Sequence, residues 1–441
     1  MNSRIHIFLP ALLMLLTCLV VSQSRASMTI EITQGVSGAL PIAIVPFGSA
    51  PNLILSSDEQ LASIVQADLI RSGRFKSVDE KDFITQPHEG HEVNFRDWRL
   101  LDVPYLLIGK VSSGAQQGTF DIQFQLFDVF KAEQLEGVIL RNVEKSRLRS
   151  AAHQISDLVY ELLTGEKGAF STRIMYVVVE PKPSGRSLYS LQVADIDGHD
   201  PKKILTSSEP MMSPSWSPDG EWVAYVSYEH DGSSAIFVQE VSTGQRRMVS
   251  KQPGINGAPA WSPDGKRLAL TLSKGRNPDI YILDLASDRL QRITKSYAID
   301  TEPSWAPDGE SLVFTSDRGG NPHIYQYSFT SGKIERVTYE GRYNARASFS
   351  PDGRLLTFIH RPKQRFNVAV MTLATGELQI LSDGRLDESP SFSPNGSMII
   401  YATEDGHRGV LAAVSVDGSV KQRLAVQEGD IREPAWAPFN R

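Results

Sequence analysis

Residues 214–220 read Pro-Ser-Trp-Ser-Pro-Asp-Gly, and this stretch decides the fold because edited copies of it return five times before the C-terminus. The aromatic residue of successive copies recurs at intervals of 43 to 45 residues. A period of that length is typical of the blades of a β-propeller. The later copies are PAWSPDG from Pro259, PSWAPDG from Pro303, ASFSPDG from Ala347, PSFSPNG from Pro390 and PAWAPFN from Pro434.

The local chemistry of each copy favours short strands joined by tight turns. Ser, Pro, Asp and Gly suit the four positions of a type I turn, since proline presets φ and glycine accepts a positive φ. Three further strands are expected after each turn, and in the second repeat they cover 266–273, 279–285 and 291–295. The aromatic residue before the turn is expected to fill the space between neighbouring blades rather than to stack on a ligand.

The two ends of the repeat region predict how the ring closes. Strands at 173–180, 187–195 and 201–206 precede the first motif, whereas the sixth motif has no strands after it. One inner strand and three outer strands together make one complete blade. We therefore expect a six-bladed propeller closed by pairing of the C-terminal strand with the first strands of the domain, which leaves no free sheet edge at the join.

The composition changes near residue 168, and this change predicts two domains. We expect a small α/β domain over residues 27–165, a linker over 166–172 and the all-β propeller over 173–441. Apolar and alternating runs predict strands of the first domain at 41–47, 104–111, 119–129 and 136–144.

Two amphipathic helices are predicted in the α/β domain. The first follows a capping box at residues 57–60 and ends before Gly73. The second covers 147–165 and ends at Gly165, a residue type that readily takes the left-handed conformation after a helix. Its inward face is expected to carry Ile155, Leu158, Val159 and Leu162.

Residues 1–26 have the pattern of a cleaved secretory signal. An apolar run from Ile7 to Val21 follows Arg4, and small residues precede the expected cleavage behind Ala26. Loss of this segment removes two arginines and no acid, so the net charge changes from −6 to −8. Cys18 is the only cysteine and leaves with the signal, which excludes disulfides and thiolate metal sites from the mature chain. The acidic balance argues against nucleic acid and anionic membranes as partners.

No motif in the chain predicts catalysis. A G-x-S-x-G elbow and phosphate-binding glycine loops are absent from the sequence. His88 and His91 lie three apart without an obvious third ligand, so an exposed loop is favoured over a zinc site. We therefore predict a non-enzymatic protein with no catalytic residue and no cofactor.

The segments just before the motifs are expected to ring the mouth of the central channel. In a propeller they lead into the innermost strand of each blade, and here they are rich in Asp, Glu, Asn and Arg. A polar funnel of this kind could hold a peptide or a partner surface, although ordinary polar loops are an equally good interpretation. The segments are NGAP (256–259), DTEP (300–303), NARA (344–347), DESP (387–390) and IREP (431–434).

These features together resemble the TolB family of the Tol-Pal system. The resemblance covers the mature chain, and the mouth segments with the N-terminal domain make it more specific than the blade motif alone. It implies a monomeric periplasmic adaptor that binds the lipoprotein Pal and the inner-membrane protein TolA, and that supports outer-membrane invagination in cell division and outer-membrane integrity. It also implies recognition by colicin translocation segments, and it leaves calcium in the channel as an open possibility.

The resemblance further implies two groups of binding residues. One departure concerns the first group, because Ile255 stands where a histidine is expected. The Pal-binding residues are Asn256, Gly257, Ala258, Thr301, Glu302, Asn344, Arg346, Asp387, Glu388 and Arg432. The TolA-binding residues are Ser27, Met28, Thr29, Ile30, Glu31, Ile32 and Thr33.

The mature N-terminus has the pattern of a strand that can join another sheet edge. Apolar side chains alternate along residues 28–32, and Gly35 and Gly38 then separate this segment from the strand at Pro41. The alternative is a fixed edge strand of the α/β domain. For the whole protein the second hypothesis is a propeller lyase or hydrolase acting on an acidic polysaccharide, which would need a histidine cluster at the mouth that no repeat supplies.

Overall fold

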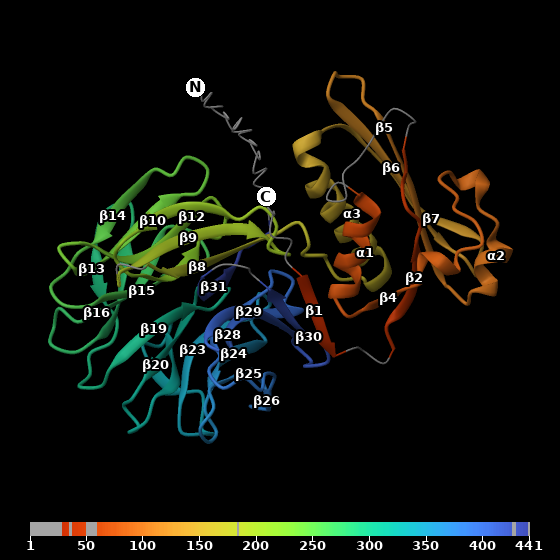
Figure 1. The fold of residues 1–441 in the computed structure, drawn as a ribbon. Coiled ribbons are helices and arrows are strands. Elements are labelled where there is room, and N and C mark those ends of the chain that lie inside the picture. The colour runs from red at the N-terminus through yellow and green to blue at the C-terminus, as the bar shows by residue number, and fades with distance from the viewer. Residues whose placement is uncertain (1–28, 35–37, 50–59, 183–184, 426–428, 440–441) are drawn as a thin grey trace, which may run out of the picture.

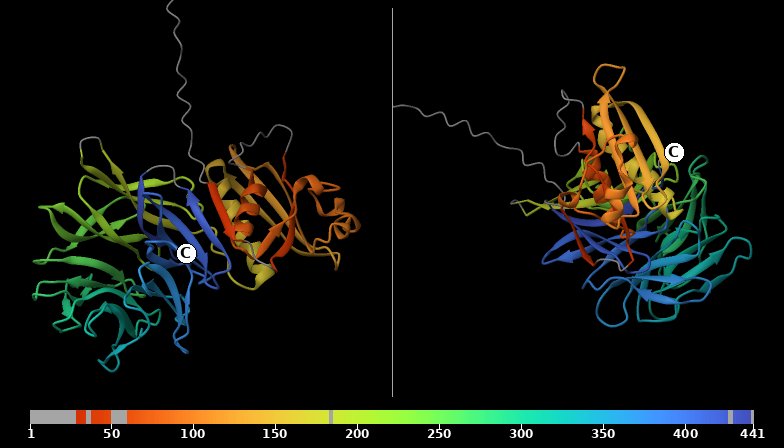
Figure 2. Two further views of the ribbon diagram at one scale, coloured as in Figure 1. Left: turned by 60° about the horizontal axis from the view of Figure 1, so that its bottom comes forward. Right: turned by 90° about the vertical axis from the view of Figure 1, so that its right-hand side faces the viewer.

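The structure is a computed structural model that describes residues 29–34, 38–49, 60–182, 185–425 and 429–439. The expected signal peptide and residues 57–59 of the expected capping box lie outside these ranges. An α/β domain and a β-propeller lie side by side, joined where helix α3 is followed by the first propeller strand (Figures 1 and 2). The expected linker, 166–172, falls between these two elements.

The α/β domain is built on one mixed sheet with the strand order β4-β2-β5-β6-β7, in which the short β3 also pairs with β5. β2 runs parallel to β4 and β5, whereas β5, β6 and β7 form an antiparallel meander. The strands are β2 (Leu40–Ile44), β3 (Gly48–Ser49), β4 (Phe75–Ser77), β5 (Tyr105–Ser113), β6 (Thr119–Asp128) and β7 (Glu133–Glu144). The four predicted strands are thus confirmed.

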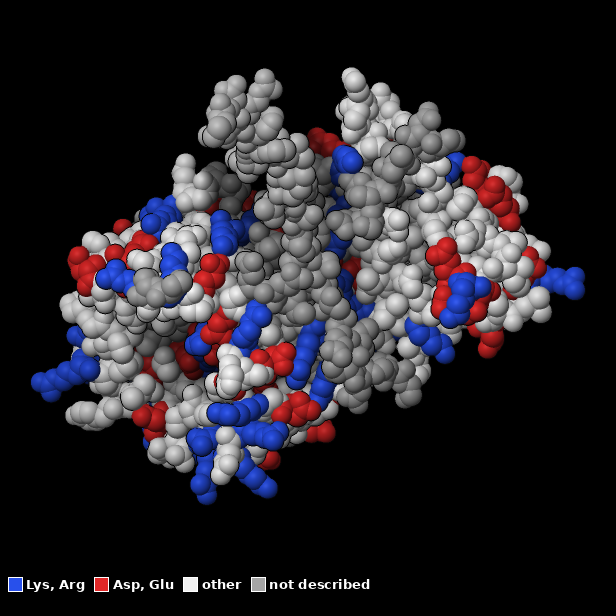
Figure 3. Space-filling view, in the orientation of Figure 1, with Lys and Arg blue, Asp and Glu red and all other residues white. Residues whose placement is uncertain are grey.

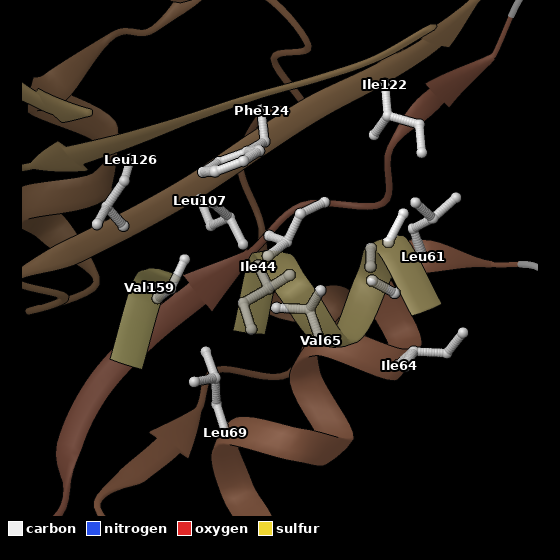
Figure 4. Close-up of a cluster of buried hydrophobic side chains, with 14 of the residues drawn as sticks. Ile44, Leu61, Ile64, Val65, Leu69, Leu107, Ile122, Phe124, Leu126 and Val159 are labelled. Atoms are coloured by element: carbon white, nitrogen blue, oxygen red, sulfur yellow. The ribbon is translucent and has the colours of Figure 1, made fainter. Parts of the chain in front are cut away.

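Helices α1 (Leu61–Arg71) and α3 (Leu148–Thr164) pack together against this sheet. Figure 4 shows the shared core, in which Val65 and Leu69 of α1 lie near Val159 of α3 and Phe124 of the sheet. The described part of the domain also contains 3₁₀ turns at Glu80–Asp82, Gly90–Glu92 and Lys145–Arg147 and the short α2 (Phe95–Leu100).

Both predicted helices are present, but one detail of the second was wrong. Gly165 ends α3 with a φ of 76°, as expected. Leu158 and Leu162, expected inside, are exposed. The buried stripe runs through Ala151, Ala152, Ile155, Val159 and Tyr160 instead, because small residues let the helix approach the sheet on that side.

The propeller has six blades of four antiparallel strands, and each inner strand begins just before its motif. Blades one to three are β11–β14 (Met211–Trp216, Trp222–His230, Ser233–Glu240, Arg246–Ser250), β15–β18 (Asn256–Trp261, Arg267–Leu272, Asp279–Asp284, Leu290–Arg292) and β19–β22 (Asp300–Trp305, Ser311–Ser316, His323–Ser328, Ile334–Arg336). Blades four and five are β23–β26 (Asn344–Phe349, Leu355–His360, Asn367–Thr372, Leu378–Ile380) and β27–β30 (Glu388–Phe392, Met398–Asp405, Arg408–Ser415, Lys421–Ala425).

Blade six closes the ring in the predicted way. Its inner strand is the C-terminal β31 (Asp430–Trp436), which pairs antiparallel with β8 (Arg173–Pro181). Trp436 lies opposite Ile174 in this register. The outer strands β9 (Ser187–Asp195) and β10 (Lys202–Ser207) complete the blade.

The motif aromatics pack between blades, as expected. Trp216 shares a core with Met175 and Val177 of blade six, and Trp305 shares one with Ile280 of blade two. Their indole N–H groups donate to backbone oxygens of the preceding inner strand, at 3.2 Å for Ala435 and 3.1 Å for Ala260. These residues therefore bridge neighbouring blades.

The N-terminal segment forms the strand β1 (Thr29–Gln34), which lies against the propeller rather than against the α/β sheet. It pairs antiparallel with β30 and extends blade five to five strands. Figure 1 shows β1, in red, beside the blue β30 at the junction of the two domains. The alternative of an edge strand of the α/β domain is therefore not what the structure shows.

Candidate binding site at the propeller channel

A bulge recurs in all six inner strands and places one residue of each blade at the channel. The pairing with the second strand skips two positions in every blade, and the first skipped residue has a φ between 45° and 55°. Each of these residues stands three positions before the motif aromatic and lines the central cavity. The ring consists of Ser213, Ala258, Glu302, Arg346, Ser389 and Glu433.

The cavity has a volume of about 630 Å³ and extends from this ring toward the turns. Its wall is formed by each inner strand from the bulge residue onward, and in every blade except blade two it reaches the proline of the turn. The opposite end of the channel is the mouth, where the inner strands begin. The bulge ring thus lies between the mouth and the cavity.

Arg346 ties the ring together. Its guanidinium forms a bidentate ion pair with Glu433, at 2.7 Å from Nη1 to Oε2 and 2.9 Å from Nη2 to Oε1. Its Nε donates to Glu302 Oε1 at 3.0 Å, and Nη1 also donates to Ser389. Strands of blades three, four, five and six are therefore linked across the channel. We call Glu302, Arg346, Ser389 and Glu433 the channel cluster.

The charges of the cluster support one another. Burial opposes the charge of Arg346, but the carboxylates of Glu433 and Glu302 outweigh it and raise the pKa of Arg346. Burial would likewise raise the pKa of Glu433, yet the facing guanidinium lowers it. Glu388, one residue before Ser389, has its pKa raised by burial and by Glu433. Arg346 is therefore the shared partner of two carboxylates at the channel, and the ion pair favours the charged forms of Arg346 and Glu433.

Three of the predicted Pal-binding residues have buried side chains. Asn256 is 1 % exposed, and its amide accepts from Ser250 and donates to the backbone of Gln252. Asn344 bonds the backbone of Glu340 and the ring of His360, and Asp387 accepts from Ser382 and Thr403. These side chains fasten the loops above them, so they shape the mouth without presenting their own surfaces to it.

The other predicted residues reach the channel or its rim. Ala258, Glu302 and Arg346 belong to the bulge ring. Gly257, Thr301 and Glu388 are partly buried beside it, and Arg432 is exposed and paired with Asp430 at 2.7 Å. The mouth is thus polar at its centre, as the segments predicted.

Exposed apolar side chains flank this polar centre on blades two to five, and only Ile255 among them was singled out from the sequence. They stand on the loops that lead into the inner strands: Ile255 (50 % exposed), Tyr297 (103 %), Ile299 (49 %), Tyr339 (71 %) and Leu386 (42 %). Large apolar residues left in water on one face are typical of a binding surface. The signal was available, because each residue precedes a polar mouth segment by one to five positions.

Ser389 and Glu433 lie inside the predicted mouth segments but were not among the predicted binding residues, and Ser213 lies in none of those segments. The motif alignment could have found them, because they occupy the same position as Ala258, Glu302 and Arg346 in their own repeats. What the alignment could not provide was the bulge, which turns this position toward the channel.

The surface charges do not form a single-sign field over the visible side of the propeller. Figure 3 shows Lys and Arg interspersed with Asp and Glu there, with a blue group at the lower edge.

In the described part of the chain no helix is long and apolar enough to span a membrane. His91 lies within the 3₁₀ turn Gly90–Glu92 and His88 lies two residues before it, while His323 and His360 are buried in blades three and four.

Comparison with known proteins agrees with both halves of the fold. Residues 160–440 match the family model described as the TolB beta propeller domain, and residues 28–135 match the TolB amino-terminal domain. The chain belongs to the TolB family. It is 56 % identical to the Tol-Pal system protein TolB of Nitrosococcus oceani over 99 % of this chain and 100 % of the relative. It is 53 % identical to that of Alcanivorax borkumensis, over 96 % of both chains.

A solved TolB structure shares the arrangement. The crystal structure of TolB from Acinetobacter baumannii superposes with a TM-score of 0.86 at 41 % identity, covering 93 % of this chain and all of that one. The TolB-family assignment therefore rests on sequence and on three-dimensional structure, and it makes the chain a component of the Tol-Pal system.

Proposed function

We propose that this TolB-family protein is a monomeric, non-enzymatic adaptor of the periplasm, which binds Pal at the channel mouth and TolA through residues 27–33. In this role it supports outer-membrane invagination during division and outer-membrane integrity. Colicin translocation segments would use the same mouth. The observation that carries the proposal is the mouth itself, a polar centre flanked by exposed apolar side chains.

The mouth has the composition of a protein-binding surface. Tyrosine side chains bury a large area at low entropic cost and dominate many interfaces, and Tyr297 and Tyr339 are both exposed on its rim. Ile255, which replaces the expected histidine, gives this chain an apolar contact where a polar one was expected. The partner at that point should therefore offer an apolar group.

The proposal that TolA binds residues 27–33 rests on the pairing of β1 with β30. The segment joins the sheet edge of blade five by backbone pairing with β30. A strand on a sheet edge can be exchanged for pairing with another protein, because the same backbone groups serve both. TolA would then take residues 27–33 when β1 leaves β30, and binding of Pal would favour the paired state.

The polysaccharide lyase or hydrolase finds no support in this geometry. Arg346 is committed to Glu302 and Glu433, and His323 and His360 are turned into their blades. The cations and histidines that such an enzyme needs at one mouth are therefore not brought together among the described residues.

The Pal proposal is tested by calorimetry with the soluble domain of Pal. Tyr297→Asp should weaken binding at least tenfold, because it removes an exposed anchor without touching the core. Ile380→Asp is the matched control, since Ile380 is 45 % exposed but lies on the outer strand β26. Equal affinity of both variants and the wild type would exclude the mouth as the Pal site.

The TolA proposal is tested by deleting residues 27–33 from the mature protein. Binding to immobilised TolA should disappear, while Pal should still bind because its proposed site at the mouth is left intact. Normal TolA binding by the deleted protein would make β1 a plain edge strand.

A further inference from the structure

A cluster of charged side chains at the junction of the two domains belongs to neither proposed binding site. His153 of α3 is 2 % exposed and faces the propeller, where Asp195 ends β9 and Asp197 lies in the following turn. One potential ligand atom from each of these three residues lies within 4.8 Å of the others. We call the three residues the junction triad.

The orientation of His153 is fixed from the other side. Its Nδ1 is 2.7 Å from Asp68 Oδ2 of helix α1, and Asp68 also accepts from Ser156 at 2.7 Å and pairs with Arg71. This contact directs Nδ1 of the ring toward α1 and leaves Nε2 as the nitrogen on the opposite side.

His153 Nε2 is buried and has no hydrogen-bond partner among the described residues. A carboxylate that holds the far nitrogen of a histidine is the usual support of a metal-binding imidazole, because it fixes the tautomer and strengthens the ligand. The unsatisfied Nε2 is thus a second observation, beside the two carboxylates, that points to a cation.

The formal charges around the junction triad are net negative, which favours a bound cation. Asp68, Asp195 and Asp197 contribute three negative charges, and Arg71 and Arg149 contribute two positive ones. Arg149 contacts Asp197 and lies 3.8 Å from Asp195, so it can hold both carboxylates in place through one oxygen each. Asp195 has a side-chain exposure of 36 %, which gives an ion access from solvent.

We propose that the junction triad binds a divalent transition-metal ion of the zinc class, and that the ion ties the α/β domain to the propeller. One imidazole nitrogen and two carboxylate oxygens form a donor set that zinc accepts, with water in the remaining position. Donors around one zinc ion lie roughly 3.4 Å apart, so the triad closes by about 1 Å on binding. Rotation of the two aspartate side chains supplies that movement.

The test is calorimetric titration of the metal-free mature protein with zinc chloride. The wild type should bind one ion, and His153→Gln should lower the affinity at least tenfold. Asp195→Asn is a second variant at a partly exposed position, so it keeps the test decisive if His153→Gln folds poorly. His91→Gln is the control, because it removes a surface histidine near His88 and should leave the affinity unchanged.

Two further readouts separate a metal site from a purely structural cluster. Cobalt should give the visible absorption of a nitrogen- and oxygen-ligated ion in the wild type but not in His153→Gln. Zinc should also slow amide exchange in α3 and in the turn at 195–199. Absence of zinc binding by the wild type, equal binding by His153→Gln, or a junction that responds to pH and not to metal would each overturn the proposal.

Discussion

Arg346 and Glu433 form a bidentate ion pair across the propeller channel, which links blade four to the C-terminal strand that closes the ring. Both side chains are partly buried, with exposures of 27 % for Arg346 and 16 % for Glu433. It joins residues 87 positions apart in the chain at the point where the propeller is completed. Closure therefore depends on charge as well as on strand pairing.

Replacing Arg346 with Met should destabilise the propeller by about 2 kcal/mol, between the values for exposed and buried ion pairs. The reason is that Glu302 and Glu433 would face each other without their common partner. Urea unfolding measures the change. Arg385→Met is the control, since Arg385 is 88 % exposed and should change stability by less than about 0.5 kcal/mol. Equal effects of both variants would contradict a role for the cluster in closure.

Glu433 of the cluster and its neighbour Glu388 predict two opposite pH dependences. Glu433 has a lowered pKa in the folded protein, so its stabilisation is complete above the ordinary value of 4.5 and is lost as the pH falls through the folded value. Glu388 has a raised pKa, so its ionised form destabilises the fold above 4.5. Glu388→Gln should therefore raise the melting temperature at about pH 7 and leave it unchanged at about pH 4.

Glu433→Gln should do the reverse and lower the melting temperature at neutral pH, with a smaller effect in acid. Thermal melts of the two variants beside the wild type measure both. Shifts of the same sign at neutral pH would show that the two carboxylates do not have opposite environments.

The motif tryptophans should differ in what their indole N–H groups contribute. Trp305 donates to Ala260 O, whereas Trp261 Nε1 is buried without a partner in the described structure. Trp305→Phe should therefore cost about 1 kcal/mol more than Trp261→Phe, the net value of one hydrogen bond. Chemical denaturation of the two variants gives the difference directly, and an equal loss would mean that shape alone decides these positions.

Strand β31 should be indispensable to the propeller. Deleting residues 432–441 removes most of the inner strand of blade six and should abolish cooperative unfolding of this domain. Trp436→Ala should cost about 3 kcal/mol, because it empties a large site between blades and removes the bond to Thr172. Calorimetric scans report both. A truncated protein that melts like the full chain would be incompatible with the observed closure.

At the mouth, Thr301→Trp should weaken Pal binding by about 1–2 kcal/mol, the scale of an interface hot spot. Thr301 is partly buried next to Glu302, so a large side chain would obstruct the polar centre. Glu302→Ala should weaken Pal binding to a similar extent and, unlike Thr301→Trp, should also lower stability through the channel cluster. Titration calorimetry and melting on the same samples separate the two effects, and wild-type affinity in both folded variants would remove these residues from the site.

The sequence by itself determined the architecture. A repeat of 43 to 45 residues with a turn motif can only be satisfied by stacked units, and the unmatched strands at the two ends required β31 to pair with β8. The two amphipathic helices and four main strands of the α/β domain were equally readable, because their periodicity follows directly from which side is buried. The same logic explains why α2 and β4 were missed, since elements of six and three residues carry too little pattern.

Only the tertiary structure decided the site. The six bulges turn the position before each motif toward the channel. No local pattern reveals that Asn256 and Asp387 face the blade while Glu433 faces Arg346. Two further features depend on how the two domains pack. β1 joins the sheet of blade five, and His153 lies close to Asp195 and Asp197. The physical reason is common to all of them: hydrophobic periodicity specifies which face of an element is buried, whereas contacts between polar groups far apart in the chain exist only once the elements have been brought together.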